Sequence, residues 1–370
     1  MVASVLLISK GGTIVRVCYI SITNMFLCPY FKTYRDITDG IAETDLIYWD
    51  RHNENEQIDG ISHIHRYCCD MNENESKITK FFNIIGFKNF CETVLKKEKY
   101  DKLIFLHNLT GFFLYPFLKK FYAGKYVFDI RDYSYESNPL FYFVEKKLIQ
   151  QAGLNVVSSG GFKDFLPEAD YVISHNDCNL SRDTISRFRM RDVNFEKKQI
   201  SFIGLVRFFE INQKLMDVFS NEKDFCLAYY GQNATVLKAY AEEHNYGSMD
   251  FYDRFPPEKT IEFYEKTDII NNFYGRGLHL DYALSNKLYY AAKLGIPILV
   301  CKGTYMERFS REYGFGISID LSAPDCVNDL RKQYNAFDRE MFLSGCDRFI
   351  TLVTEESKKF KQEMVRFITA

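Results

Sequence analysis

The sequence of 370 residues predicts an α/β protein of two lobes, and three observations support this. At ~150 residues per domain, the length suggests two domains. Short apolar runs rich in β-branched and aromatic residues alternate with amphipathic runs of helix length, which indicates βαβ units and a parallel sheet. A polar stretch rich in Arg and Asp, 176–198, interrupts the alternation before it starts again. The simplest architecture is two Rossmann-like lobes with a linker between them and a cleft where they face each other.

The first lobe is predicted over residues 1–177, with residues 1–15 as an extension. Two apolar runs lie near the start, Met1–Ile8 and Val15–Ile22, and we take the second as the first core strand because the later pattern follows from it. The first run lacks a basic segment and an A-x-A site, so we do not expect a signal peptide. The expected strands are 16–22, 45–49, 61–67, 102–107, 125–129, 155–158 and 170–173, and the expected helices include 77–97, 113–121 and 138–151.

The second lobe is predicted over residues 199–340, after a linker at 178–198. Its expected strands are 199–203, 225–230, 250–255, 268–273 and 298–300, and its expected helices are 213–220, 234–244, 258–266 and 286–294. Residues 341–370 have the pattern of a helix with many charges, and we expect this helix to cross back to the first lobe.

Composition excludes several classes of protein. The net charge of −2 offers no global basic field for a nucleic-acid backbone. The ten cysteines show no C-x-x-C spacing, and scattered thiols suit a reducing compartment. No run reaches the ~18 apolar residues of a membrane span. We therefore expect a cytoplasmic protein that binds no nucleic acid, with peripheral association at the inner face of the membrane left open.

The segment 284–300 carries the clearest signal for a binding site. Ser285 is a good N-cap, and Gly295 with Pro297 ends the helix. A helix N-terminus has free N–H groups and a partial positive charge, and Lys287 falls in its first turn. The pattern suits a diphosphate site; the alternative is an ordinary capped helix of an α/β domain.

The same segment also resembles part of a known protein family. The run Asn286-Lys287-Leu288-Tyr289, followed by Gly295-Ile296-Pro297, resembles the donor-site helix of the GT-B glycosyltransferases, especially the retaining, glycogen-synthase-like enzymes of bacterial polysaccharide synthesis. The resemblance covers about residues 16–345 and rests on order and spacing. Its other pieces are Phe105–Asn108, Phe128–Asp132, Val156–Ser159 with Gly161-Phe162, Phe202-Ile203-Gly204 with Arg207, Tyr230-Gly231, Asp268–Tyr274 and Gly314-Phe315-Gly316.

The resemblance implies a nucleotide diphosphate sugar as donor and no resident cofactor. The donor-binding residues that it implies are Gly204, Arg207, Gly231, Ser285, Asn286, Lys287 and Tyr290. Tyr290 stands where family members often have a ribose-binding Glu, so the ribose contact departs from the family pattern.

In the first lobe, polar residues follow two predicted strands. His107 ends one of them, and the resemblance places it near the donor sugar. Asp129 and Asp132 end the next, and one carboxylate could assist deprotonation of an acceptor hydroxyl. Asn108 and Arg131 are the expected acceptor contacts, although Arg131 could equally hold Asp129 in place. The alternatives are a structural histidine and a salt-bridged turn.

The run from His63 to Cys69 holds two histidines and two cysteines, a mixture that could bind a metal. The cysteines, Cys68 and Cys69, are adjacent, so their side chains point to opposite sides of a strand, and no second Cys/His pair follows. We therefore expect a structural strand and no metal. Gly275-Arg276-Gly277 lacks the G-K-[ST] of a phosphate loop and is expected to be a donor loop.

The leading interpretation is a glycosyltransferase that moves a hexose from a nucleotide diphosphate sugar to a saccharide or lipid-linked saccharide, in bacterial surface polysaccharide synthesis. The resemblance implies retention of configuration. We expect no need for a metal, because Arg207, Lys287 and the helix N-terminus would supply the positive charge. Two alternatives stay open: a nucleotide-sugar epimerase on the same architecture, and a non-catalytic, degenerate transferase that acts as a scaffold.

Overall fold

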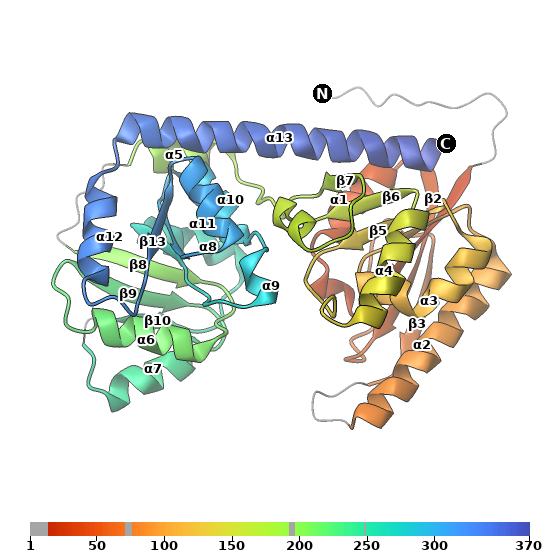
Figure 1. Ribbon diagram of the computed structural model, residues 1–370, viewed down its shortest axis with the longest axis horizontal. Helices are drawn as coiled ribbons and strands as arrows, with labels where there is room; N and C mark the ends of the chain where they lie inside the picture. The colour runs from red at the N-terminus through yellow and green to blue at the C-terminus, as the bar shows by residue number, and fades with distance from the viewer. Residues whose placement is uncertain (1–13, 71–75, 192–196, 248) are drawn as a thin grey trace. The chain divides into compact units, whose positions relative to one another are not determined.

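The computed structural model describes residues 14–70, 76–191, 197–247 and 249–370 (Figure 1). The chain divides into two compact units: unit 1 runs up to His175 and includes Glu356–Ala370, and unit 2 is Asn176–Glu355. The predicted extension lies outside the described residues apart from its last two positions, where the first strand begins at Val15.

Unit 1 contains a sheet of seven parallel strands in the order β3-β2-β1-β4-β5-β6-β7. This order is the doubly wound arrangement, in which the strand order reverses beside β1. The α/β prediction is confirmed, with strand bounds close to those expected. The strands are β1 Val15–Ser21, β2 Ala42–Asp50, β3 His63–Cys68, β4 Lys102–Phe105, β5 Tyr126–Ile130, β6 Leu154–Val157 and β7 Tyr171–Ile173.

Helices cover both faces of this sheet. Those between its strands are α1 Phe31–Thr38, α2 Lys77–Glu98, α3 Asn108–Phe121 and α4 Pro139–Gln151. α2, α3 and α4 lie on one face (Figure 1), where Trp49 of β2 stacks on Phe87 of α2. α1 was not predicted, and α3 begins at Asn108 instead of Phe113. Gly111 made the start of this helix hard to predict, because glycine has a low helix propensity. A Cβ atom at this position would lie 2.6 Å from the Phe128 ring, so the glycine allows α3 to pack close to β5.

Unit 2 contains six parallel strands in the order β10-β9-β8-β11-β12-β13. They are β8 Lys198–Ile203, β9 Phe225–Tyr230, β10 Asp250–Tyr252, β11 Ile269–Asn272, β12 Ile298–Cys301 and β13 Gly316–Ile319. The helices are α5 Arg182–Arg189, α6 Phe209–Phe219, α7 Ala234–Glu243, α8 Thr260–Glu265, α9 Leu278–Asp281, α10 Asn286–Leu294, α11 Tyr305–Glu312 and α12 Cys326–Asn335. β13 and the two helices beside it were not predicted.

A helix, α5, forms within the segment that was predicted as the linker. The Ser181 Oγ accepts a hydrogen bond from the Thr184 N–H at 3.1 Å and caps this helix. Phe188 is buried in the apolar cluster of unit 2, and the Arg189 guanidinium donates to the carbonyls of Ala292 and Lys293. The helix is short and mostly polar, with Ile185 and Phe188 as its large apolar residues, so its sequence looks like a loop. Positions 192–196 of the predicted linker lie outside the described residues.

The last helix, α13 Arg339–Thr369, contributes to both units. Phe342, Cys346 and Phe349 belong to an apolar cluster of unit 2, whereas Phe360 and Met364 belong to one of unit 1, together with Tyr34 of α1. In the part of the chain that the structure describes, no helix is both long and apolar enough to cross a membrane.

Candidate functional site

Two glycines bring the loops after β8 and β9 into backbone contact. The Gly204 N–H donates to the Tyr230 carbonyl at 2.8 Å, which continues the strand pairing past the ends of the strands. Gly231 has a φ of 140°, and a Cβ on it would lie 2.0 Å from the Gly204 carbonyl oxygen. Only glycine fits there without a backbone shift. At the carboxyl edge of this sheet the two loops therefore pack backbone against backbone.

Lys287 places a buried positive charge at the same edge. It lies in the first turn of α10, where the Ser285 Oγ accepts from the Lys287 N–H at 3.3 Å. Its side chain is 7% exposed. The Nζ atom donates to the Tyr274 hydroxyl at 2.8 Å and lies 4.2 Å from the centroid of the Phe202 ring. A Cβ on Gly204 would be 3.8 Å from this Nζ atom.

No carboxylate of the described residues lies within ion-pair distance of the Lys287 ammonium, whose hydrogen-bond partner is the phenol of Tyr274. A buried charge without a counter-ion is costly, and an anion at this helix N-terminus would compensate it. The arrangement can hold a phosphate or diphosphate group.

The remaining predicted donor residues differ in their surroundings. Asn286 and Arg207 are exposed, in the first turn of α10 and in the β8–α6 loop respectively. Tyr290 instead packs against α8, where its ring stacks on Tyr264 with centroids 4.7 Å apart, and against the apolar cluster of unit 2. These contacts give no support to a donor contact by Tyr290, which stays a prediction.

In unit 1, Asp129 and Arg131 form a buried ion pair at the end of β5. The Asp129 Oδ2 accepts from the Arg131 Nε at 2.8 Å and from the Tyr34 hydroxyl at 2.8 Å. The other nitrogens of Arg131 donate to the carbonyl and hydroxyl oxygens of Ser174, and the guanidinium lies 4.0 Å from the Tyr30 ring centroid. Burial raises the pKa of the Asp129 carboxyl, and the Arg131 charge opposes that rise.

Asp129 has no exposed surface, and the contacts of its Oδ2 hold Arg131 in place. Its catalytic role stays a prediction. Asp132, by contrast, is exposed just beyond the strand. Of the predicted carboxylate pair, only Asp132 is open to a substrate in unit 1.

The sequence analysis expected His107 to end a strand. In the structure, β4 ends at Phe105, and His107 is the N-cap residue of α3. Its Nε2 lies 3.4 Å from the Tyr30 hydroxyl and 3.8 Å from the Cys28 Sγ. Its Nδ1 is buried and has no hydrogen-bond partner among the described residues. Burial, followed by the positive charges of Arg51 and Arg131, lowers the pKa of His107 to about 4. The imidazole is therefore neutral at pH 7 and can donate or accept one hydrogen bond.

Asn108 connects this edge to two acidic residues that the sequence analysis missed. Its Nδ2 donates to Glu145 at 3.1 Å and to Glu136 at 3.4 Å, and its Oδ1 accepts from the Ser134 hydroxyl at 3.0 Å. Burial and the neighbouring Glu136 raise the pKa of Glu145 to about 8. The signal was present in the sequence: Glu145 lies on the helix face of Phe141 and Leu148, where an apolar residue is expected. Asn108 is itself buried, which leaves its predicted acceptor contact a prediction.

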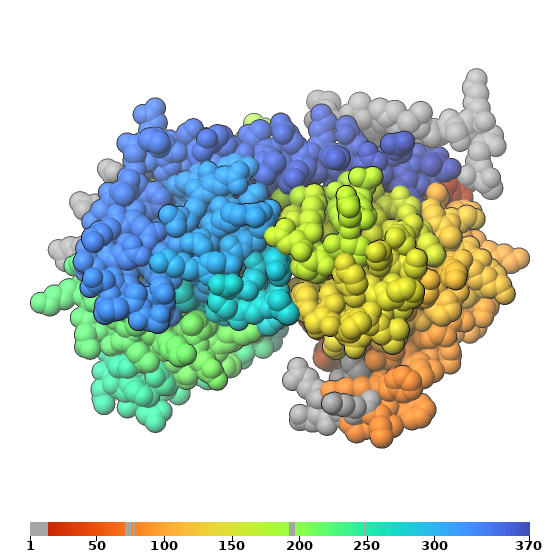
Figure 2. All heavy atoms as spheres, viewed as in Figure 1, coloured from red at the N-terminus to blue at the C-terminus, as the bar shows by residue number. Residues whose placement is uncertain are grey.

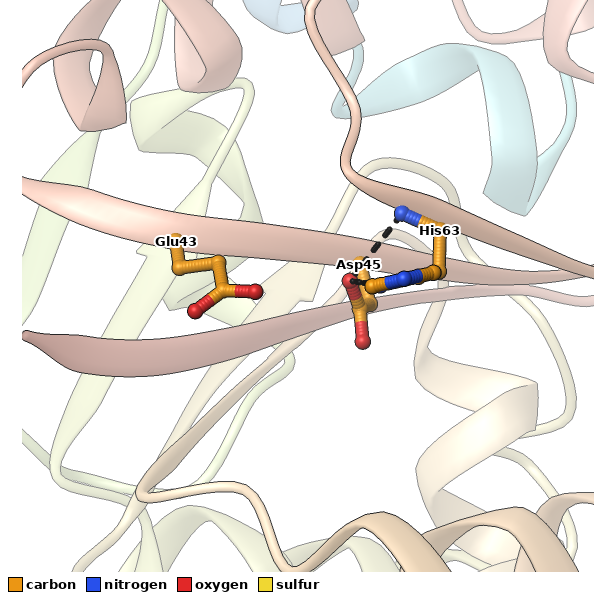
Figure 3. Close-up of side chains that lie close together, drawn as sticks. All are labelled: Glu43, Asp45 and His63. Carbon is orange, nitrogen blue, oxygen red and sulfur yellow. Dashed lines mark hydrogen bonds and ion pairs between the residues drawn. The ribbon is translucent and has the colours of Figure 1, made fainter.

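The histidines and cysteines of β3 do not come together as a metal cluster. In the described ranges, the group with a suitable spacing is Glu43, Asp45 and His63 (Figure 3). Asp45, however, already accepts from the His63 Nδ1 at 3.1 Å, the Arg16 guanidinium at 3.2 Å and the Tyr100 hydroxyl at 2.7 Å. The Arg16 charge thus already compensates the Asp45 carboxylate.

Comparison with known proteins gives a result for the fold only. No protein-family model matches the sequence, and no curated protein matches it either. Solved structures do match over nearly the whole chain. Sucrose-phosphate synthase from Thermosynechococcus elongatus superposes with a TM-score of 0.70 at 10% identity, and the match covers 94% of this chain and 98% of that one.

The chain has the GT-B glycosyltransferase fold. Two more matches agree. The lipopolysaccharide outer core galactosyltransferase WaaB gives a TM-score of 0.65 at 13% identity, covering 95% of this chain and 99% of that one. Anabaena HepE, solved in complex with UDP, gives 0.63 at 10% identity, covering 94% and 99%. At these identities the likeness extends to the GT-B architecture, and the chemistry must be argued from the side chains.

Proposed function

We propose that this protein is a glycosyltransferase that moves a hexose from a nucleotide diphosphate sugar to a saccharide or lipid-linked saccharide. The observation that carries the proposal is the buried Lys287 ammonium beside Gly204, which lacks a counter-ion among the described residues. The GT-B fold, shared with galactosyltransferases and sucrose-phosphate synthase, supports it. The UDP complex of HepE supports a uridine nucleotide as the first ligand to test.

Unit 2 is proposed to hold the donor. When the bond between the sugar and the diphosphate breaks, negative charge grows on the departing diphosphate. Lys287, the N–H groups at the start of α10 and the exposed Arg207 are proposed to stabilise that charge. With these positive groups we propose transfer without a metal ion, and from the family resemblance we propose retention of configuration.

Unit 1 is proposed to hold the acceptor at the carboxyl edge of its sheet, where open α/β sheets bind ligands. His107 is neutral at pH 7, so it can form a hydrogen bond to a sugar hydroxyl without repelling the nearby guanidinium groups. Asp132 is the exposed carboxylate for an acceptor hydroxyl. Asp129 takes part indirectly, as the partner that fixes Arg131.

Exposed apolar side chains support a lipid-linked acceptor and the association of the protein with a membrane surface. Ile78, Phe81 and Phe82, in the first turns of α2, are 58–70% exposed, and Leu140 and Phe143 are exposed at the start of α4. Figure 2 shows both helices at the surface of unit 1, α2 in orange and α4 in yellow. Both helices follow strands of the parallel sheet and begin on the side of its carboxyl edge, where the acceptor site is proposed.

Donor binding is the direct test of the proposed function. UDP and a panel of UDP-, GDP- and ADP-sugars are titrated by calorimetry against the wild type and the variants Lys287→Ala and Arg207→Ala. Each variant should lose roughly 1.5–3 kcal/mol of affinity, the range for a charged hydrogen bond. The control is Lys238→Ala, which removes an exposed lysine of α7 in the same unit.

Unchanged affinity in both variants would remove the donor from this helix. Conversion of the sugar without an acceptor would indicate the epimerase, and failure to bind any nucleotide would indicate the scaffold.

Membrane association has its own test. The double variant Phe81→Ser with Phe82→Ser should sediment less with anionic lipid vesicles than the wild type, because it removes two exposed rings from α2. Val236→Ser, at an exposed apolar residue of α7 in unit 2, is the control. Equal sedimentation of all three proteins would refute a membrane contact through α2.

A further inference from the structure

Buried polar atoms without a partner gather at the carboxyl edge of the unit 1 sheet. Among the described residues these include the Arg51 Nε and the His107 Nδ1. The two residues stand just after the ends of β2 and β4, and in a parallel sheet those ends share one edge. Buried polar atoms are nearly always hydrogen-bonded. A group of unsatisfied atoms at one edge therefore indicates a place where a ligand supplies the partner.

Arg51 differs from Arg131 at this edge because no acidic side chain of the described residues neutralises its positive charge. Its guanidinium lies 4.6 Å from the Trp49 ring centroid, and no carboxylate of the described residues pairs with it. Burial alone lowers the pKa of Arg51 to about 10, with no neighbouring acid to oppose it. Arg131, in contrast, is paired with Asp129 at 2.8 Å. The edge thus carries one uncompensated positive charge.

Two of the three acidic residues nearest in sequence, Asp50 and Glu56, are engaged elsewhere, and the third, Glu54, is exposed. The Asp50 carboxylate accepts from the Asn24 amide at 2.7 Å and from the Arg66 guanidinium at 3.4 Å. The Glu56 carboxylate accepts from the Met25 N–H at 2.9 Å. These bonds tie the loop after β1 to the loop after β2. These hydrogen bonds fix the loop that carries Arg51, so the guanidinium is preorganised for binding a ligand.

We propose that Arg51, with His107 beside it, binds an anionic group of the acceptor, a phosphate or a carboxylate on the saccharide. The inference rests on the proposed function, since it names the class of acceptor that unit 1 takes. A guanidinium offers a planar fork that matches either anion. Arg51 and His107 follow the ends of β2 and β4 at the same edge of the sheet, and each has a buried nitrogen without a partner that could donate to the ligand. A neutral sugar would leave the Arg51 charge uncompensated.

The test uses three probes: glucose 6-phosphate, glucuronate and glucose. Each is titrated into the full chain with UDP present, so that phosphate bound at the donor site is not counted. Binding is followed by the ring proton signal of His107 in NMR spectra, identified by its loss in His107→Gln. At least one charged probe should bind saturably and at least about tenfold more tightly than glucose. The two charged probes distinguish a phosphate from a carboxylate.

Two variants separate recognition from stability. Arg51→Gln should abolish the preference for the charged probe and raise the pKa of His107, since one of the charges that lower it is gone. Arg35→Gln, at a surface arginine of α1 paired with Asp36, removes the same charge and should keep the preference. A merely structural Arg51 would lower the melting temperature in Arg51→Gln and leave the preference intact.

Equal binding of all three probes, no binding of either charged probe, or equal loss in both variants would overturn the inference. The proposed function is judged separately by UDP affinity, which is measured on the same samples and depends on unit 2.

Discussion

Glu145 makes the stability of unit 1 depend on pH in a way that one substitution should remove. In the folded chain its carboxyl is buried beside Glu136, and its pKa is raised from 4.5 to about 8. The folded state therefore holds a proton that the unfolded state has released between those two pH values. Stability is full below the unfolded pKa and is lost as the pH rises toward 8. At about 1.36 kcal/mol per pKa unit, the full loss is roughly 5 kcal/mol.

Glu145→Gln should abolish this loss. The amide keeps the Oε1 that accepts from Asn108 at 3.1 Å and has no acidic proton to release. The variant should match the wild type near pH 4.5 and exceed its free energy of unfolding by several kcal/mol at pH 8. His107, whose pKa is lowered, titrates in the opposite sense, with stability falling as the pH drops below 6.5. Its contribution cancels when variant and wild type are compared at each pH.

The assay is urea denaturation at pH 5, 6, 7 and 8, followed by the fluorescence of Trp49. This residue is the one tryptophan of the sequence, and it is buried in β2 of unit 1, so it reports on the unit that contains Glu145. Glu168→Gln, at an exposed glutamate of the same unit, serves as the control. Parallel curves of wild type and Glu145→Gln over the whole range would refute a raised pKa at Glu145.

Two further predictions concern residues of the candidate sites. Gly231→Ala should cost about 2–4 kcal/mol in unfolding free energy, because the new Cβ meets the Gly204 carbonyl oxygen; Gly314→Ala, at a positive φ with open space, should cost less, and equal costs measured by urea denaturation would contradict the clash. His107→Ala should lower kcat more than donor affinity, since a contact made in the transition state acts on turnover; near-normal turnover with a reduced melting temperature would assign His107 a structural role.

The strands were predictable because buried parallel strands are short, nearly continuous apolar runs, as in Val127 and its neighbours of β5. Short, mostly polar helices were missed, and the start of one longer helix was misplaced. α5 packs through Phe188 and Arg189, and α3 begins across a glycine whose missing side chain makes room for a ring. In each case a tertiary contact overrides local propensity, and a single sequence does not display that contact.

Some features of the candidate sites could likewise be predicted from the sequence, and others could not. Gly204, Gly231 and Lys287 could be found because backbone approach and helix ends leave glycines and caps in the sequence at regular spacing. The buried state of Asp129 and the unpaired state of Arg51 could not be found. Both depend on which groups from distant strands and helices lie beside them, and that information is absent from local pattern.

The last helix also sets an order of events during synthesis. Phe360, Met364, Phe367 and Ile368 complete an apolar cluster whose other members include Val17 and Tyr19 of the first strand. The ribosome makes all of unit 2 between these two sets of residues. At ~5–20 residues per second, the nascent unit 1 must wait many seconds with one face of its sheet uncovered. Any premature stop upstream of Phe360 would release a chain whose first-made unit stays unfinished, however complete the second one is.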